Sequence, residues 1–252
     1  MVRTRIIPCL QLIDNSLVKA VQFKKYSYIG DPVNTVRIFN ELEVDELCFL
    51  DIRATLEQRT PNFEILRQIA EECFMPLSYG GGVKDAATAK KILSIGFEKI
   101  VINTAAFYNP TLISDIAAHS GSQSIIGSID VRKNLLGKYQ LYSHDGTKKE
   151  KINPVEWAIR LQELGVGELL LTSMDKEGTW NGYDMNITQI ISDAVTIPVI
   201  ANGGAGNITH IEDVLQKAHA SAAALGSMVV YQKEGMGVLV NFPDKRELDK
   251  LI

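Results

Sequence analysis

The chain has few of the residues that build disulfide scaffolds or metal centres. Its 252 residues include only three cysteines and four histidines. No group of histidine, cysteine and acidic residues has the spacing of metal ligands, and we expect neither a metal nor another cofactor. The three cysteines are odd in number and sit in apolar runs, which indicates reduced core residues of a cytoplasmic protein. They are Cys9, Cys48 and Cys73.

Long apolar runs and basic stripes are also missing. No stretch approaches the length of a membrane span, and the run in Met1–Asn15 is too short for a signal peptide. The net charge is −4 and the charged residues are mixed along the chain, so nucleic acid is not an expected partner. What remains is a chain with 46% apolar residues, enough for a large core.

An internal repeat organises the sequence. An apolar run that ends in glycines occurs at Pro76–Val83, PLSYGGGV, and returns 122 residues later at Pro198–Ala205, PVIANGGA. Glu46–Leu50 and Glu168–Thr172 have the same offset. The chain therefore consists of two half-length units in tandem.

Short β-rich runs alternate with helical patterns along the whole chain. Most of these runs are continuously apolar, as in parallel strands that are buried on both faces. Eight strand–helix units in about 250 residues predict one (βα)8 TIM barrel over residues 1–252, built from two half-barrels. A doubly wound open sheet is the alternative. The expected strands are Arg5–Leu12, Glu46–Asp51, Pro76–Gly80, Lys99–Asn103, Gln123–Asp130, Glu168–Thr172, Ile197–Ala201 and Ala222–Leu225.

A helical pattern follows each strand. Prolines and glycines are well placed to begin and end several of these helices. Two longer loops, Asp14–Asp31 and Arg132–Asn153, follow strands one and five, and Tyr139–Tyr142 could pair with Lys148–Ile152 in the second loop. The expected helices are Pro32–Leu42, Phe63–Cys73, Asp85–Leu93, Pro110–His119, Pro154–Leu164, Ile187–Ala194, Ile208–Ala218 and a last stretch that reaches Ile252.

Each half of such a barrel has a candidate anion site. The active site of a TIM barrel lies at the carboxyl ends of its strands, and the two glycine turns end strands three and seven. Free N–H groups in such turns suit phosphate. Together with strands four and eight, the two sites would hold a substrate with two phosphates or comparable anions. A single site at strands seven and eight is the alternative.

Strands one and five face each other between the two anion sites. Asp130 ends strand five and can act there as an acid or base, although a strand-end aspartate also often caps a helix or forms a salt bridge. Gln11 has the equivalent place, and its amide cannot take up a proton near neutral pH. Lys19 lies in the first long loop and could fold down on an anionic substrate, or it could be a solvated surface lysine.

Charged residues begin four of the expected strands. In a barrel these residues would approach a ring around the bottom opening. Scattered surface charges and salt bridges are the alternative. The four are Arg5, Glu46, Lys99 and Glu168.

Over essentially its whole length the chain resembles the cyclase subunit of imidazole glycerol phosphate synthase. The motifs that carry this resemblance are, together, highly specific. They are RIIPCL at Arg5–Leu10, GDPV at Gly30–Val33, DELCFLDI at Asp45–Ile52, PLSYGGGV at Pro76–Val83, INTAAF at Ile102–Phe107, GSQSII at Gly121–Ile126, LLTSMDKEGTWNGYD at Leu170–Asp184 and PVIANGGAGN at Pro198–Asn207.

The resemblance implies a partner and a reaction. In this family a glutaminase releases ammonia, which passes up through the barrel to a bisphosphorylated ribonucleotide. Ammonia addition, ring closure and cleavage then give imidazole glycerol phosphate and aminoimidazole carboxamide ribonucleotide. We therefore expect a lyase-type cyclase subunit with a glutaminase at the N-terminal face of its barrel.

The resemblance also implies residue roles. Lys19 would clamp the substrate, and Asp130 would be one of two catalytic aspartates. Arg5, Glu46, Lys99 and Glu168 would form a salt-bridged gate for ammonia. One phosphate is assigned to Gly82, Asn103 and Thr104, and the other to Gly178, Gly204, Gly226 and Ser227.

The chain departs from the family mainly at the mouth of the barrel. The second catalytic aspartate falls at Gln11, and Glu177 stands where the family commonly has aspartate. Ala20, Arg53 and Asn202 replace the usual glycine, threonine and serine. The four gate charges are intact. With an altered mouth and an intact floor, the chain resembles divergent paralogues of the family. These paralogues accompany an amidotransferase in making amidino-sugars for surface polysaccharide.

Three functions follow from these observations. The first is a subunit that channels glutaminase-derived ammonia to a sugar-amidating step. The second is an authentic cyclase of histidine biosynthesis that tolerates Gln11. The third is a scaffold that activates a glutaminase without chemistry of its own.

Overall fold

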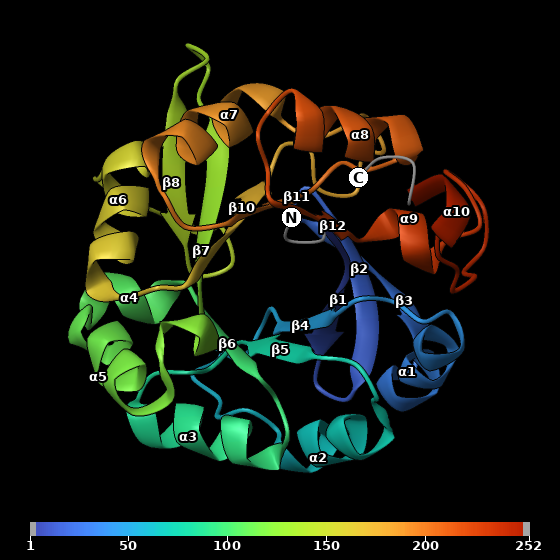
Figure 1. Ribbon diagram of the computed structural model, residues 1–252, viewed down its shortest axis with the longest axis horizontal. Helices are drawn as coiled ribbons and strands as arrows, with labels where there is room; N and C mark the ends of the chain where they lie inside the picture. The colour runs from blue at the N-terminus through green and yellow to red at the C-terminus, as the bar shows by residue number, and fades with distance from the viewer. Residues whose placement is uncertain (1–3, 249–252) are drawn as a thin grey trace.

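Eight parallel strands close into a barrel in the computed structural model, which describes residues 4–248 (Figure 1). The first strand pairs with the second and the last, and the fifth pairs with the sixth, so the ring has no open edge. The (βα)8 prediction is confirmed, and the open-sheet alternative is excluded. In order around the ring, the strands are β1 (Arg5–Ile13), β4 (Leu47–Asp51), β5 (Leu77–Gly80), β6 (Lys99–Ile102), β7 (Ile125–Lys133), β10 (Glu168–Ser173), β11 (Val199–Asn202) and β12 (Ala222–Leu225).

Helices surround the barrel on its outside (Figure 1). Several begin at an asparagine or aspartate whose side chain accepts a backbone N–H, such as Asn62 and Asp85, and Pro32 and Pro154 occupy the first turns of two helices. The long helices are α1 (Pro32–Glu41), α2 (Phe63–Glu72), α3 (Ala86–Ile95), α5 (Thr111–Ser120), α6 (Pro154–Leu164), α7 (Met185–Ala194) and α8 (Ile208–Gln216).

Short helices follow the fourth and eighth barrel strands. α4 (Thr104–Tyr108) and α9 (Ser227–Val230) occupy equivalent places in the two halves, and the sequence pattern did not predict α4 as a separate helix. A single 3₁₀ turn, η1 (Ser122–Ser124), precedes β7. The last expected helix corresponds to α10 (Lys245–Leu248), and residues 249–252 lie outside the described part of the chain. None of the described helices is long and apolar enough to cross a membrane.

The two long loops fold into antiparallel hairpins that extend β1 and β7. The first contains β2 (Ser16–Val21) and β3 (Lys25–Gly30), so the expectation of a loop over Asp14–Asp31 is wrong. The second contains β8 (Tyr139–Ser143) and β9 (Lys148–Lys149), and the predicted pairing is confirmed over a shorter length. Each half-barrel thus has a hairpin above its first strand.

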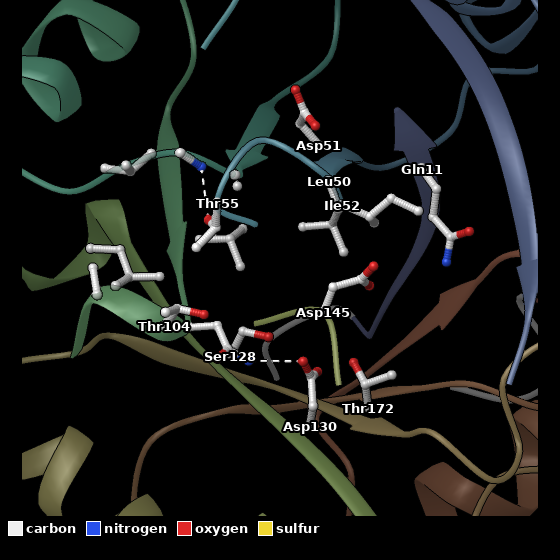
Figure 2. A pocket seen from close by; sticks show the side chains of 18 of the residues that line it. Gln11, Leu50, Asp51, Ile52, Thr55, Thr104, Ser128, Asp130, Asp145 and Thr172 are labelled. Atoms are coloured by element: carbon white, nitrogen blue, oxygen red, sulfur yellow. Dashed lines mark hydrogen bonds between the residues drawn. The ribbon is translucent and has the colours of Figure 1, made fainter. Parts of the chain in front are cut away.

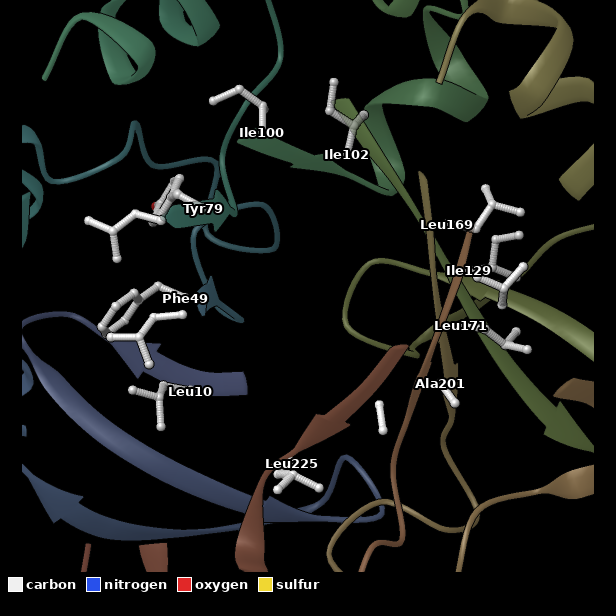
Figure 3. Packing of buried hydrophobic residues seen from close by; sticks show 14 of the residues in the cluster. Leu10, Phe49, Tyr79, Ile100, Ile102, Ile129, Leu169, Leu171, Ala201 and Leu225 are labelled. Carbon is white, nitrogen blue, oxygen red and sulfur yellow. The ribbon is translucent and has the colours of Figure 1, made fainter. Parts of the chain in front are cut away.

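The barrel has two apolar layers, because successive strand residues point to opposite faces. Outward side chains such as Leu10, Phe49 and Leu171 pack against the helices (Figure 3). Inward side chains form a smaller cluster that includes Ile7 and Cys9. Four inner columns begin with a charge at the floor of the barrel, at Arg5, Glu46, Lys99 and Glu168.

Candidate active site and floor of the barrel

The main pocket lies at the carboxyl ends of the strands and has a volume of about 110 Å³. Figure 2 shows Asp130, Ser128 and Thr172 on one side of this pocket, with Gln11 and Asp51 contributed by the opposite strands. A second cavity of about 330 Å³ shares part of the wall near β5 and β6. The shared residues are Thr55, Gly82, Val83, Thr104 and Ala105.

Asp130 lies in the pocket, as predicted. Its neighbour on β10 is Thr172, and Asn103 Nδ2 donates a hydrogen bond to Asp130 Oδ2 at 2.9 Å. Burial raises the pKa of the Asp130 carboxyl to about 7, and the negative charge of Asp145 acts in the same direction. The group can therefore give or take a proton near neutral pH. Its catalytic role stays a prediction.

Asp145 is a pocket carboxylate that the sequence analysis missed. It lies in the turn between β8 and β9 and lines the same cavity as Asp130. Tyr26 Oη on β3 donates to Asp145 Oδ2 at 3.3 Å, and burial raises the pKa of Asp145 to about 6. The available signal was the dipeptide Asp145-Gly146, which is typical of a tight hairpin turn.

Gln11, Lys19 and Glu177 form a buried cluster beside the pocket. Gln11 Nε2 donates to Glu177 Oε1 at 3.1 Å, and Gln11 Oε1 accepts from the Ala20 N–H at 2.8 Å. Lys19 makes an ion pair with the same glutamate oxygen, and burial lowers the pKa of its ammonium to about 8. Lys19 is therefore neither a solvated surface lysine nor a side chain on an open loop, because β2 holds it inside.

The first predicted anion site belongs to the main pocket, which Gly82, Asn103 and Thr104 line together. The Gly82 N–H already donates to Thr55 Oγ1 at 3.2 Å. A Cβ at neighbouring Gly81, which has φ 120°, would lie 2.4 Å from the Asp51 carbonyl oxygen. The glycine turn thus also serves a structural need, because the chain after β4 packs directly against it.

The second predicted anion site lies under the first hairpin. A Cβ at Gly226 would be 2.9 Å from Lys19 Cε, and one at Gly178 would be 2.6 Å from the Ala20 carbonyl oxygen. The structure therefore brings Lys19 to these residues but leaves them outside the wall of the main pocket. The residues of this site are Gly178, Gly204, Gly226 and Ser227.

The four charges at the floor of the barrel form one connected network. Arg5 contacts Glu46 and Glu168 at 2.8 Å each, and Lys99 contacts the same two carboxylates at 3.0 and 3.1 Å. The Glu46 side chain is only 3% exposed. The ring predicted from strand starts is therefore present, and scattered surface charges are not what the structure shows.

An apolar interior separates this floor from the pocket. Just above Glu46 lies a cavity of about 10 Å³, close to the smallest space that holds one water-sized molecule. Its wall includes Ile7, Cys48 and Leu170. Cys9 and Cys48 are buried free thiols here, on adjacent strands. Among residues 4–248 no group of histidines, cysteines and acids could hold a metal.

These features define a (βα)8 barrel with a recessed acid-lined pocket at the mouth and a charged floor. Residues 5–235 match the sequence profile of the histidine biosynthesis protein family, and the chain belongs to this family.

The chain is also similar to several named relatives. It is 48% identical to imidazole glycerol phosphate synthase subunit hisF2 of Pseudomonas aeruginosa, across 99% of both chains. It is 43% identical to subunit HisF of Leptospira borgpetersenii, across 100% of this chain and 99% of the other. Both names mark the role as provisional. Subunit HisF of Alkaliphilus metalliredigens, named without that qualification, is 41% identical across 92% of each chain.

Proposed function

We propose that this chain is the ammonia-accepting barrel of a glutamine amidotransferase and acts in the cytoplasm with a glutaminase. The observation that carries the proposal is the ring formed by Arg5, Glu46, Lys99 and Glu168 at the barrel floor. Ion pairs on side chains can part and re-form without breaking a strand. The small apolar cavity above the ring suits a neutral amine of water size, and the pocket beyond it would receive that amine.

The glutaminase would dock on the face that surrounds this ring. Phe74 lies in the connection from α2 to β5, at the amino end of the strand, and is 86% exposed. Leu42, in the equivalent connection from α1 to β4, is 37% exposed. Exposed aromatic residues often anchor protein interfaces. These two side chains support a partner at the N-terminal face.

The altered mouth favours an acceptor other than that of the histidine pathway. Gln11 uses both ends of its amide on Glu177 and the Ala20 N–H, so this position offers no acid or base to a substrate. The substrate we propose is a phosphorylated or nucleotide-activated sugar that is amidated for surface polysaccharide. The chain would supply ammonia to that step with a retained gate and a modified pocket.

The test is reconstitution with the glutaminase and amidating enzyme encoded beside this chain. We expect a stable complex with the glutaminase, and glutamine-dependent amidation of the sugar that stops when the barrel is omitted. The proposal is wrong if the glutaminase does not bind and amidation proceeds without the barrel. If Asp130→Asn leaves the product yield unchanged while the complex persists, the barrel is a scaffold.

A cyclase of histidine biosynthesis is the second candidate. The joint presence of Asp130, Gly82, Asn103 and Thr104 in one pocket favours it. Complementation separates the two functions: an authentic cyclase restores growth without histidine to a strain that lacks its own cyclase subunit, and the proposed paralogue does not. If a Gln11→Asp variant gains activity only on the ribonucleotide, the chain descends from a cyclase but no longer acts as one.

A further inference from the structure

We propose that Asp145 is a catalytic carboxylate and forms, with Asp130, the acid–base pair of the pocket. The inference rests on the proposed function, because it needs ammonia to reach this pocket. It goes beyond that function in stating that the barrel performs ammonia addition itself. Asp145 would fill the role that the amide at Gln11 cannot.

The first observation is the shared cavity. Asp130 comes from β7 and Asp145 from the turn between β8 and β9, yet both side chains line the main pocket (Figure 2). The two groups also interact electrostatically, because the charge of Asp145 raises the pKa of Asp130. With Asp51 from β4, the pocket therefore has three carboxylates, and none of them comes from β1. Asp51 is already held by Arg59 and by the N–H groups of Arg53 and Ala54, which leaves Asp130 and Asp145 for a substrate.

The second observation is the backbone of the turn. His144, Asp145 and Gly146 have φ values of 51°, 53° and 71°, and the Thr147 N–H donates to the His144 carbonyl oxygen at 3.1 Å. Two successive non-glycine residues in the left-handed region are uncommon, and such conformations cluster at functional sites. At Asp145 this conformation places a carboxylate over the pocket, although a glycine would adopt the same φ at a lower cost in free energy.

The third observation is what surrounds Asp145. Tyr26 is its hydrogen-bond donor, and Arg53, which lies 5.2 Å from the centre of the Tyr26 ring, attracts it at longer range. Within the described residues, no lysine or arginine makes an ion pair with Asp145. Burial raises the pKa of Asp145 to about 6, while Tyr26 and Arg53 oppose that shift. Lone pairs of this carboxylate remain available to a substrate.

The pair can carry out addition of ammonia to a carbonyl carbon. The nitrogen lone pair forms the new C–N bond while the carbonyl π electrons move to oxygen. One carboxylic acid, Asp130, gives its proton to that oxygen, and the Asp145 carboxylate takes a proton from nitrogen. The product is a carbinolamine, and the two groups have exchanged protonation states. Reversal of the two roles then expels the oxygen as water and leaves an imine.

The experiment supplies ammonium chloride to the barrel alone, in separate reactions with the activated sugar of the proposed function and with the bisphosphorylated ribonucleotide, and measures product formation in each. We expect measurable turnover by the wild type and a loss of about 10²–10⁴-fold in kcat for Asp145→Asn. Asp14→Asn is the matched control, since Asp14 also lies in a hairpin turn at positive φ but is 75% exposed and outside the pocket. This variant should keep the wild-type rate.

Tyr26→Phe provides an independent readout. It removes the hydrogen bond that holds the pKa of Asp145 down, so the acidic limb of the pH–rate profile should move to higher pH. Tyr26→Phe therefore tests the catalytic role of Asp145 even if Asp145→Asn fails to fold. The inference is overturned if the wild type turns over neither substrate, if Asp145→Asn keeps the wild-type rate, or if the profile of Tyr26→Phe does not shift. Because free ammonium bypasses the glutaminase and the floor, these outcomes are independent of whether the proposed complex forms.

Discussion

Gln11 Nε2 donates a hydrogen bond to Glu177 Oε1 at 3.1 Å, which joins β1 to the segment after β10 across 166 residues of sequence. The other end of the Gln11 amide accepts the Ala20 N–H. One side chain thus ties β1, the β2–β3 hairpin and the segment after β10 together. Gln11 and Glu177 therefore depend on each other, because a change at either position removes the hydrogen bond between them.

Gln11→Asp should loosen the first hairpin. The aspartate side chain is one methylene shorter, lacks the N–H donor and places a second carboxylate beside Glu177. We expect loss of both hydrogen bonds, each worth about 1 kcal/mol, and faster hydrogen exchange at the Ala20 amide. Gln68→Asp on the exposed face of α2 is the control. Unchanged exchange at Ala20 would show that the Gln11 amide does not hold the hairpin.

Lys19 and Glu177 should show strong energetic coupling. Lys19→Met leaves a buried carboxylate without its cation, which typically costs about 3–5 kcal/mol. The double variant Lys19→Met/Glu177→Gln removes both charges and should recover much of that loss. Urea unfolding of the two single variants and the double variant measures the coupling. Simple additivity of the two single effects would contradict the buried ion pair.

Asp130→Asn should stabilise the fold in a pH-dependent way. The native pKa of Asp130 is raised to about 7, so between its ordinary pKa and 7 the native state binds more protons than the unfolded state. Wild-type stability therefore falls as pH rises through this window, by up to about 1.4 kcal/mol per pH unit from this group. The gain from Asp130→Asn should be larger at pH 8 than at pH 4.

Thermal unfolding at several pH values makes this comparison. Asp115→Asn on the exposed face of α5 is the control and should change stability little at any pH. If Asp130→Asn changes stability equally at pH 4 and pH 8, burial does not destabilise the ionised form of the Asp130 carboxyl.

Phe74→Asp should abolish binding of the glutaminase without unfolding the barrel, because Phe74 is an exposed aromatic residue on the floor side. Leu136→Asp is the matched control, since Leu136 is 83% exposed but lies in the turn between β7 and β8, beyond the carboxyl end of β7. Binding can be measured by isothermal titration calorimetry. If the Leu136 variant loses binding and the Phe74 variant keeps it, the partner docks on the wrong face for the proposal.

Most of the fold could be predicted from local patterns and the repeat. β12 and α6 match their predicted bounds, and the other barrel strands differ only at their ends. The first hairpin was missed because its residues, rich in lysine, tyrosine and serine, resemble a polar loop. Only the tertiary structure shows that Leu17 and Ile29 are buried. The strand ends therefore predicted the position of the pocket, while the β2–β3 hairpin beside it could not be predicted.

The site was predicted where strand ends define it and missed where contacts are distant in sequence. Asp130 and the floor ring follow from strand ends and starts in a closed barrel. Lys19 meets Glu177 across 158 residues, and no local pattern predicts that pair. Asp145 reaches the pocket only because of the length and turn geometry of the second hairpin, which the sequence does not fix.

The most direct test of ammonia transfer is an isotope competition. The chain and its glutaminase receive [amide-¹⁵N]glutamine, a large excess of unlabelled ammonium, and either the ribonucleotide or the activated sugar with its amidating enzyme. Mass spectrometry then gives the ¹⁵N fraction of the product. We predict a product that is almost entirely ¹⁵N with the wild-type barrel and strongly diluted with Arg5→Ala. A wild-type product whose label matches the free ammonium pool would contradict passage of ammonia through the barrel.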